Sequence, residues 1–270
     1  MLCGARLRAA MLALEGGAAA AAAAAAGERG ACAGRVTRLA PRGPDGSAGG
    51  ESEASSSEAA AVGAAAAALR AGGLVALPTD TVYGLACLAQ DPRALAGLYR
   101  LKGRDGSKPL AVCLPDVPHV YRYCKVRVPE QLLRDLLPGP VTLVLERAEA
   151  LHKELNPFTP LVGIRIPSHW FIKEVAKACA GPLALTSANL SDRASSLVVT
   201  EFQELWPHLA LIVDGGPIGD AQSPVCRLGS TVVDLSVPGK FKVIRPGCAL
   251  SQTVEILVSK YGLTSDPPSS

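Results

Sequence analysis

The stretch from Leu74 to Leu85, which reads LVALPTDTVYGL, constrains the fold more than any other part of the chain. Its first four residues are apolar and follow Gly72-Gly73, which predicts a short buried strand. Pro78 ends that strand, because proline cannot donate a ladder hydrogen bond. The polar turn that follows, Thr79–Tyr83, is a candidate site, since ligands bind outside the carboxyl ends of strands in open α/β sheets. Because Thr and Asp also cap helices, the turn alone supports a ligand site and a helix cap about equally.

Short apolar stretches separated by Gly and Pro breaks predict the other elements. Asp91-Pro92 predicts a helix N-cap with proline at the first helical position. Strands alternate with helices in the first half of the chain and crowd together near its end, which predicts one α/β domain with a mixed sheet. The expected strands are 74–77, 110–114, 141–145, 161–166, 182–185, 211–213, 230–235 and 241–244, and the expected helices are 58–70, 93–101, 129–137, 169–180, 201–209 and 253–261.

Residues 1–56 differ in composition from the rest of the chain, because Ala, Gly, Arg and Ser dominate and aromatic residues are absent. Such a segment buries too little apolar surface to offset its chain entropy, so we expect it to be disordered. Its first 44 residues hold six arginines and two acidic residues. That bias is typical of an organelle transit peptide, and a low-complexity tail explains it equally well. We therefore expect one domain over 57–262 and a flexible tail over 263–270.

The overall composition narrows the class of protein. Almost half of the 270 residues are apolar, and no apolar run reaches the roughly 18 residues of a membrane-spanning helix, so we expect a globular domain without a transmembrane segment. A net charge of +3 predicts that any RNA binding is local or weak. The eight cysteines show neither CxxC nor zinc-like spacing, which favours buried, reduced thiols. The four histidines are widely spaced, and the chain has no Walker loop and no GxGxxG motif.

Polar residues recur directly after expected strands, at Thr79–Tyr83, Thr186–Asn189, Asp214–Gly216 and Arg245. Strand ends at one edge of a sheet can converge on a single pocket. We therefore expect these four clusters to lie close together in the folded chain.

Two cations and two polar side chains extend this set. Lys102 and Arg104 lie two residues apart in a turn; such a pair can neutralise a polyphosphate, although it is more often a solvated basic turn. Ser187 and Asn189 offer a hydroxyl and an amide for a phosphate or ribose, or form a Ser or Asx turn. Arg165 interrupts an apolar strand, so it is either exposed at an edge or paired with an anion such as a ligand carboxylate.

Eight motifs, taken in order over roughly residues 60–248, resemble the YrdC family of threonylcarbamoyl-AMP synthases. They are GGLVALPTDTVYGL, YRLKGRDGSKPLAV, LLPGPVTLVLE, VGIRIPSH, GPLALTSANLS, IVDGG, GSTVVD and VIRPG. The resemblance implies a single domain with a twisted mixed β-sheet, flanking helices and a concave ligand groove. It also implies that L-threonine, bicarbonate and ATP are converted to threonylcarbamoyl-adenylate and diphosphate. A separate transferase complex would then modify the adenosine beside the anticodon in tRNAs that read codons beginning with A.

The family's motifs also imply which residues bind the substrates. Many members have His where this chain has Cys113, so a contact to threonine is expected to be lost or replaced. No residue is expected to bind a metal directly. The implied ATP-binding residues are Lys102, Arg104, Thr142, Ser187, Asn189 and Arg245, and the implied threonine-binding residues are Thr79, Thr81, Arg165, Thr186 and Ser230.

The implied chemistry needs no side-chain nucleophile, because a carbamate oxygen attacks the α-phosphate and diphosphate leaves; cations that stabilise spread negative charge are sufficient. Mg²⁺ bridging the phosphates is the expected cofactor, held by few protein carboxylates. Two other hypotheses remain open: a module that binds RNA in the same groove without catalysis, and an enzyme that handles a carbamoyl-adenylate in another pathway. We expect the protein in both the cytoplasm and the mitochondrion.

Overall fold

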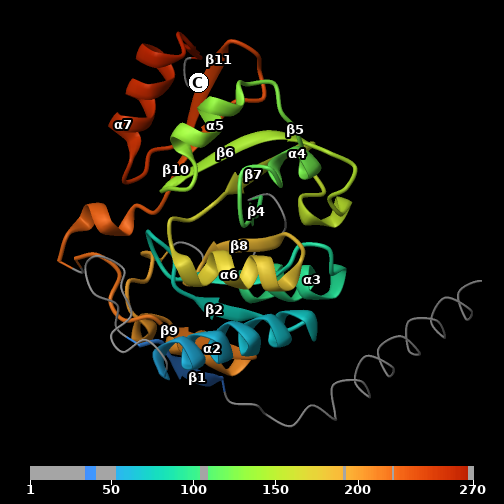
Figure 1. Ribbon diagram of the computed structural model, residues 1–270, viewed down its shortest axis with the longest axis vertical. Coiled ribbons are helices and arrows are strands. Elements are labelled where there is room, and N and C mark those ends of the chain that lie inside the picture. The colour runs from blue at the N-terminus through green and yellow to red at the C-terminus, as the bar shows by residue number, and fades with distance from the viewer. Residues whose placement is uncertain (1–33, 41–52, 104–108, 191–192, 221, 267–270) are drawn as a thin grey trace, which may run out of the picture. The chain divides into compact units, whose positions relative to one another are not determined.

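A computed structural model of the chain describes residues 34–40, 53–103, 109–190, 193–220 and 222–266 (Figure 1). Within these ranges the strands form one mixed sheet in the order β1-β9-β2-β3-β8-β4-β7-β6-β10-β11-β12, with β5 beside β6. The strands are β1 (Arg35–Arg38), β2 (Val75–Leu77), β3 (Gly84–Leu88), β4 (Ala111–Cys113), β5 (Cys124–Lys125), β6 (Val141–Arg147), β7 (Leu161–Arg165), β8 (Leu183–Ser187), β9 (Leu211–Asp214), β10 (Thr231–Asp234), β11 (Lys240–Arg245) and β12 (Thr264–Ser265). The helices are α2 (Glu53–Arg70), α3 (Pro92–Leu101), α4 (Val120–Tyr123), α5 (Glu130–Leu136), α6 (Trp170–Cys179) and α7 (Leu250–Glu255), with shorter or irregular turns η1 (Lys153–Leu155), η2 (Val199–His208), η3 (Pro224–Arg227) and η4 (Ile256–Lys260).

The prediction of a single α/β domain with a mixed sheet is confirmed. Parallel pairs join β1 and β2 to β9, β4 to β7, β6 to β10 and β11 to β12, while the other neighbouring pairs are antiparallel. The predicted N-cap is also confirmed, because the Asp91 carboxylate accepts from the backbone N–H groups of Arg93 at 2.9 Å and Ala94 at 3.2 Å. Among the described residues, no helix is both long and apolar enough to cross a membrane.

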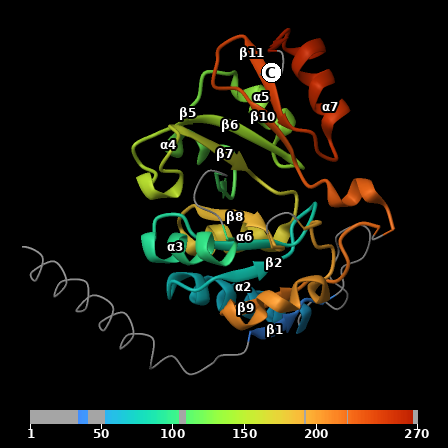
Figure 2. The ribbon, with the colours of Figure 1, turned by 180° about the vertical axis from the view of Figure 1, so that it is seen from behind.

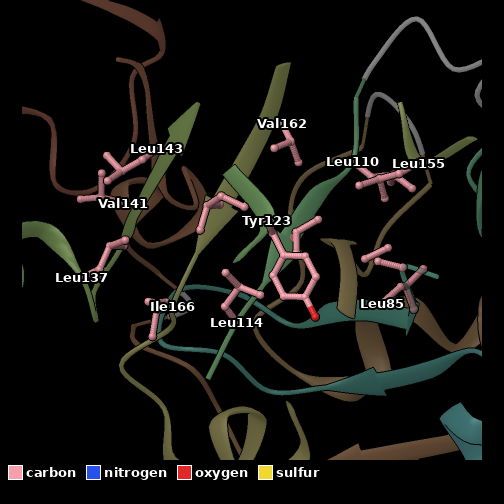
Figure 3. Close-up of a cluster of buried hydrophobic side chains, with 14 of the residues drawn as sticks. Leu85, Leu110, Leu114, Tyr123, Leu137, Val141, Leu143, Leu155, Val162 and Ile166 are labelled. Carbon is pink, nitrogen blue, oxygen red and sulfur yellow. The ribbon is translucent and has the colours of Figure 1, made fainter. Parts of the chain in front are cut away.

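Helices cover the two faces of the sheet unequally. α2 and α6 pack against each other on one face, where Phe171 and Val175 of α6 share a buried cluster with residues of β2, β3 and β8. Both helices lie in front of the strands in Figure 1. On the other face, α3 packs on β3 and lies in front in Figure 2. That face carries the larger core, and Figure 3 shows members of it such as Leu85, Leu143 and Val162. The helices α2 and α6 leave part of their own face uncovered, and this part holds the site.

Two short strands lie in stretches that the sequence predicted to be without structure. β1 falls inside the segment 1–56, where it pairs with β9, and Arg38 Nε donates to Asp214 Oδ2 at 3.1 Å. β12 falls inside the predicted tail and pairs with β11. A sheet edge binds a short strand through backbone hydrogen bonds, so the low apolar content of these stretches does not exclude pairing. The remainder of the 1–56 segment before α2, residues 1–33 and 41–52, lies outside the described residues.

β3 is a central strand that the sequence analysis missed, because Gly84 was interpreted as the end of the preceding turn. Its discovery also removes the helix-cap interpretation of Thr79–Tyr83, since a strand and not a helix follows the turn. The predicted helix 201–209 is a 3₁₀ segment kinked at Phe202, and the predicted helix 253–261 begins at Leu250 and ends in a π-helical turn.

Candidate active site

A cavity of about 640 Å³ lies over the middle of the sheet, on the face that α2 and α6 cover in part. Side chains alternate between the two faces of a strand, so every second residue of a strand reaches the cavity. Gly163 and Arg165 of β7 line it, as do Thr142 and Val144 of β6. The complete set of lining residues among those described is Thr79, Val82, Gly84, Pro109, Leu110, Ala111, Thr142, Val144, Thr159, Leu161, Val162, Gly163, Arg165, Leu185, Thr186, Ser187, Ser195, Gly229, Ser230, Val232, Asp234, Ile244 and Arg245.

The floor of the cavity is made of small residues on neighbouring strands. Gly163 is paired with Ala111 on one side and Val144 on the other. A Cβ at Gly163 would lie 2.9 Å from Thr142 Cγ2, which is closer than real Cβ contacts come. A larger residue at this position would therefore displace the Thr142 side chain.

One wall carries a cluster of two hydroxyls and a guanidinium. Thr142 Oγ1 and Ser230 Oγ lie 2.9 Å apart, and Arg245 NH2 donates to Ser230 O at 2.8 Å and to Ser230 Oγ at 3.3 Å. The turn after β11 holds this cluster in place, because a Cβ at Gly247 would lie 2.3 Å from Ser230 C and from Thr231 N. This wall presents a cation and hydrogen-bonding hydroxyls to an anionic ligand.

A second cation lies at the carboxyl end of β7. The Arg165 side chain is 8% exposed, and its NH2 donates to Asp80 Oδ1 at 2.5 Å and to Thr81 Oγ1 at 2.6 Å. Asp80 also accepts from the Ser168 N–H at 2.9 Å. β7 is an interior strand, so Arg165 is paired with an anion of this chain and is not exposed at an edge. Its Nε is buried and has no hydrogen-bond partner among the described residues.

The turn after β2 is held largely by its own side chains. Thr79 Oγ1 donates to Val82 O at 2.7 Å and accepts from the N–H groups of Thr81 and Val82 at 3.2 Å each. Tyr83 donates to Gly216 O at 2.7 Å and accepts from the Gly215 N–H at 2.9 Å, and burial raises the pKa of its phenol to about 12. The turn and the Asp214–Gly216 cluster therefore lie together, as expected. The hydrogen bonds of Tyr83 that join them stabilise the fold.

Lys102 is buried and bonds to the turn after β8. It is 1% exposed, and Nζ donates to Ser187 O at 2.8 Å and also to Asn189 O. Asn189 Nδ2 donates to the backbone oxygens of Leu190 and Arg193 at 2.7 Å each. Lys102 and Asn189 therefore build the turn that positions Ser187. Arg104 lies outside the described residues.

The structure thus brings most of the sequence-predicted site residues to one cavity. Three predicted site residues do not line the cavity, namely Thr81, Lys102 and Asn189. Thr81 bonds to Arg165, which does line it, and Lys102 and Asn189 belong to the hydrogen bonds of the turn after β8. Their roles in substrate binding stay predictions. Those that line the cavity are Thr79, Thr142, Arg165, Thr186, Ser187, Ser230 and Arg245.

Sequence reasoning missed the apolar floor and one carboxylate. Val232 and Asp234 line the cavity together with Ser230. The alternation along GSTVVD could have found them, because Ser230 was already a candidate and residues two and four positions further point to the same face of a strand.

The cysteines of the described region are free thiols, as predicted, but they are not all buried. Cys87, Cys113 and Cys124 are buried, whereas Cys248 is exposed on the turn after Arg245. Cys113 is paired in register with Arg165, does not line the cavity, and has its thiol pKa raised to about 12 by burial. Within the described ranges there is no group of three or more His, Cys, Asp or Glu side chains that could hold a metal ion.

Comparison with known sequences places these features in a family. The sequence model of the Sua5/YciO/YrdC family, described as telomere recombination, matches residues 67–247. Threonylcarbamoyl-AMP synthases of Mus musculus and Homo sapiens are 70% and 71% identical over 195 residues, which is 72% of this chain and 70% of each relative.

Solved structures agree with this assignment. Pyrococcus abyssi Sua5 complexed with L-threonine superposes with a TM-score of 0.68 at 27% identity, covering 86% of this chain and 62% of that protein. E. coli YciO has the same fold, with a TM-score of 0.66 at 22% identity over 79% of this chain and 96% of that protein. From the family match, the high identity to the mammalian relatives and the shared fold, we conclude that this chain belongs to the Sua5/YciO/YrdC family.

Proposed function

We propose that this chain is a threonylcarbamoyl-AMP synthase, which joins L-threonine, bicarbonate and ATP into threonylcarbamoyl-AMP and releases diphosphate and water. The observation that carries the proposal is the cavity that gathers Arg165, Arg245, Thr142 and Ser230 over a floor of small residues. Each of the three substrates carries negative charge, and this cavity presents cations and hydroxyls to them. The names of the 70–71% identical relatives support the same function.

The cavity residues fit the chemistry of an adenylate-forming reaction. The threonine amine and bicarbonate form a carbamate with loss of water, and a carbamate oxygen then displaces diphosphate from the α-phosphate. Arg245, held by Ser230, would stabilise the charge that develops on the phosphate oxygens. Arg165, held by Asp80, would bind the threonine carboxylate with the guanidinium N–H groups that Asp80 and Thr81 do not occupy. None of these steps needs a covalent bond to the protein.

Mg²⁺ is the proposed companion of ATP. Asp234 is the one carboxylate among the described residues that line the cavity. This donor set fits an ion whose ligands come mainly from phosphate oxygens and water, as is usual for Mg²⁺. When bound, the ion would neutralise charge on the β- and γ-phosphates.

Diphosphate release by the full chain tests the proposal. We expect release from ATP to require both L-threonine and bicarbonate. Release that needs no threonine would favour a carbamoyl-adenylate enzyme of another kind. Tight, salt-sensitive tRNA binding without any diphosphate release would favour the RNA-binding module instead.

The fate of the product is a further part of the proposal. Threonylcarbamoyl-AMP would pass to a transferase complex that modifies the adenosine beside the anticodon in tRNAs reading codons that begin with A. Adding purified transferase and such a tRNA to the reaction should yield threonylcarbamoyladenosine, and tRNA that stays unmodified while product accumulates would contradict this step.

The proposed location is both cytoplasm and mitochondrion, with the transit signal before the folded domain. β1 begins at Arg35 and belongs to the sheet, so removal of residues beyond this point would take away a strand. We therefore place the signal within residues 1–34. A reporter fused to residues 1–34 should enter mitochondria in part, and a wholly cytosolic reporter would exclude a transit role.

A further inference from the structure

Asp234 is a cavity residue that takes no part in the threonine and phosphate contacts proposed above. It is the last residue of β10, it is half-buried, and it lines the cavity. Its Cα is in register with Val144 of β6 and Lys242 of β11. Oδ1 accepts from the Ser236 N–H at 2.8 Å, and Oδ2 forms no hydrogen bond within the described residues. The bond to Ser236 explains how the strand ends, but not why an acid faces the cavity.

The two ends of the cavity differ in chemistry. Around Asp234 the lining is apolar and includes Val144, Val232 and Ile244. The hydroxyl and guanidinium cluster of Ser230 lies four residues back along the chain, a separation of about 13 Å in an extended strand. The Cα of Arg245 pairs with Val232, one pleat repeat from Asp234, whereas its guanidinium lies at the other end of the cavity, where it donates to Ser230.

A carboxylate in this position selects what can lie beside it. It repels phosphate, bicarbonate and the threonine carboxylate, and it attracts hydrogen-bond donors or cations. Among the proposed substrates, the donors are the ribose hydroxyls, the adenine amino group and the ammonium and hydroxyl of threonine. The ribose is the donor group joined to the α-phosphate through a single carbon. With a phosphate on Arg245 at the Ser230 end, the ribose is therefore the first donor group that the nucleotide can extend toward Asp234.

We propose that Asp234 accepts hydrogen bonds from the ribose hydroxyls of the nucleotide and thereby makes the enzyme selective for ribonucleotides. The inference rests on the proposed use of ATP. Each carboxylate oxygen has two acceptor sites, so Oδ2 and the second site of Oδ1 can take the two vicinal hydroxyls while the bond to Ser236 is kept.

Asp234→Asn is the informative variant, because an Asn Oδ1 can keep the bond to the Ser236 N–H while the negative charge is removed. A matched control is Asp220→Asn. Asp220 Oδ1 accepts from the Gln222 N–H at 2.8 Å, in the same two-residue pattern, and Asp220 does not line the cavity. Both variants are made in the full chain, and their thermal melting is compared with that of the wild type to verify folding.

The experiment measures diphosphate release with ATP, 2′-deoxyATP and 3′-deoxyATP in the presence of threonine and bicarbonate. The wild type should prefer ATP to each deoxynucleotide by about tenfold or more in kcat/KM, since a hydrogen bond to a charged group has that effect. Asp234→Asn should raise the KM for ATP by about the same factor and lose the preference, with kcat little changed. The Asp220→Asn control should behave as the wild type does.

Three results would overturn the inference. The first is equal use of ATP and both deoxynucleotides by the wild type, and this result can be observed without any variant. The second is an Asp234→Asn variant that raises the KM for threonine instead of ATP, which would assign the carboxylate to the amino acid. The third is a variant whose only change is the Mg²⁺ concentration required, which would make Asp234 a ligand of the ion.

Failure of the proposed function gives a different result. If the wild type releases no diphosphate with threonine and bicarbonate, calorimetric titration with ATP and 2′-deoxyATP still tests the inference. Tighter binding of ATP by the wild type, lost in Asp234→Asn, would support it without turnover. Equal binding of the two nucleotides would refute it.

Discussion

At the scale of the single residue, Arg165 shows why a charge can be kept in the middle of an apolar strand. The guanidinium binds Asp80 and Thr81, which lie more than 80 positions earlier in the chain, and so joins the turn after β2 to the end of β7. The pair is almost completely buried, with 8% and 10% of the two side chains exposed. Removing one partner of such a pair leaves an unpaired buried charge.

We therefore expect Arg165→Ala to lower the free energy of unfolding by about 3–5 kcal/mol, and Arg165→Ala combined with Asp80→Asn to recover part of this loss. Urea denaturation provides the measurement. The exposed pair of Arg134 and Glu130 is the control, since its side chains are 49% and 51% exposed and Arg134→Ala should cost less than about 1 kcal/mol. Equal losses at the two sites would contradict the structural role given to Arg165.

Tyr83 gives a prediction for alkaline pH. Burial raises the pKa of its phenol to about 12 in the folded chain, from 10.0. The neutral phenol is therefore favoured by folding, so its contribution to stability is complete below pH 10 and is lost as the pH rises toward 12. We expect the stability advantage of the wild type over Tyr83→Phe to shrink between pH 10 and 12. The buried thiols titrate in both proteins, so their contribution cancels in this difference. Urea unfolding of the two proteins at several pH values would measure the difference. A difference that stays constant from pH 10 to 12 would contradict the raised pKa of Tyr83.

At the scale of the element, the turn after β11 places Arg245 by close backbone contact. Gly247 lies against Ser230 and Thr231. A Cβ on Gly247 would lie only 2.3 Å from the carbonyl carbon of Ser230 and from the backbone nitrogen of Thr231. Backbone atoms cannot move aside as the end of a long side chain can. The glycine therefore couples the position of β11 to the hydroxyl cluster on β10.

Gly247→Ala should displace this turn and reduce kcat/KM for diphosphate release by about a hundredfold, as small misplacements in an active site do. Gly97→Ala on α3 is the matched control. A Cβ at Gly97 meets nothing within 4 Å, so this variant should keep its activity and gain roughly 0.5–1 kcal/mol of stability from the better helix former. Full activity in Gly247→Ala would show that the turn can relax without moving Arg245.

At the scale of the whole molecule, β1 extends the domain toward the amino terminus. It covers an edge of β9, and its Arg38 pairs with Asp214, which also lies 3.5 Å from the Tyr83 hydroxyl. The sheet therefore links a segment of low-complexity composition to the turn that borders the cavity. A domain boundary drawn at residue 57 from composition alone removes this strand and part of α2.

We expect a fragment of residues 41–270 to melt at least about 2 °C below a fragment of residues 34–270, since the loss of one strand and its ion pair costs more than about 1 kcal/mol. Scanning calorimetry of the two fragments would measure this. The same melting temperature for both would mean that β1 adds nothing to the stability of the sheet.

Local patterns were sufficient to predict many elements of this chain. The apolar stretches that end in Gly or Pro mark most of the central strands, and Asp91-Pro92 marks the start of α3. The same patterns failed where an element depends on a distant partner. β1 and β12 are strands only because β9 and β11 offer paired edges, and β3 was hidden because its glycine looks like the end of a turn.

The sequence by itself determined the class of fold and most of the side chains that reach the cavity, because backbone preferences and strand alternation act over a few residues. Only the tertiary structure decided which of these side chains contact one another. In the folded chain Lys102 donates to backbone carbonyls, Arg165 pairs with Asp80, and Asp234 lines the cavity. Strand order and register decide such contacts, and they depend on packing across the whole sheet, which no local pattern encodes.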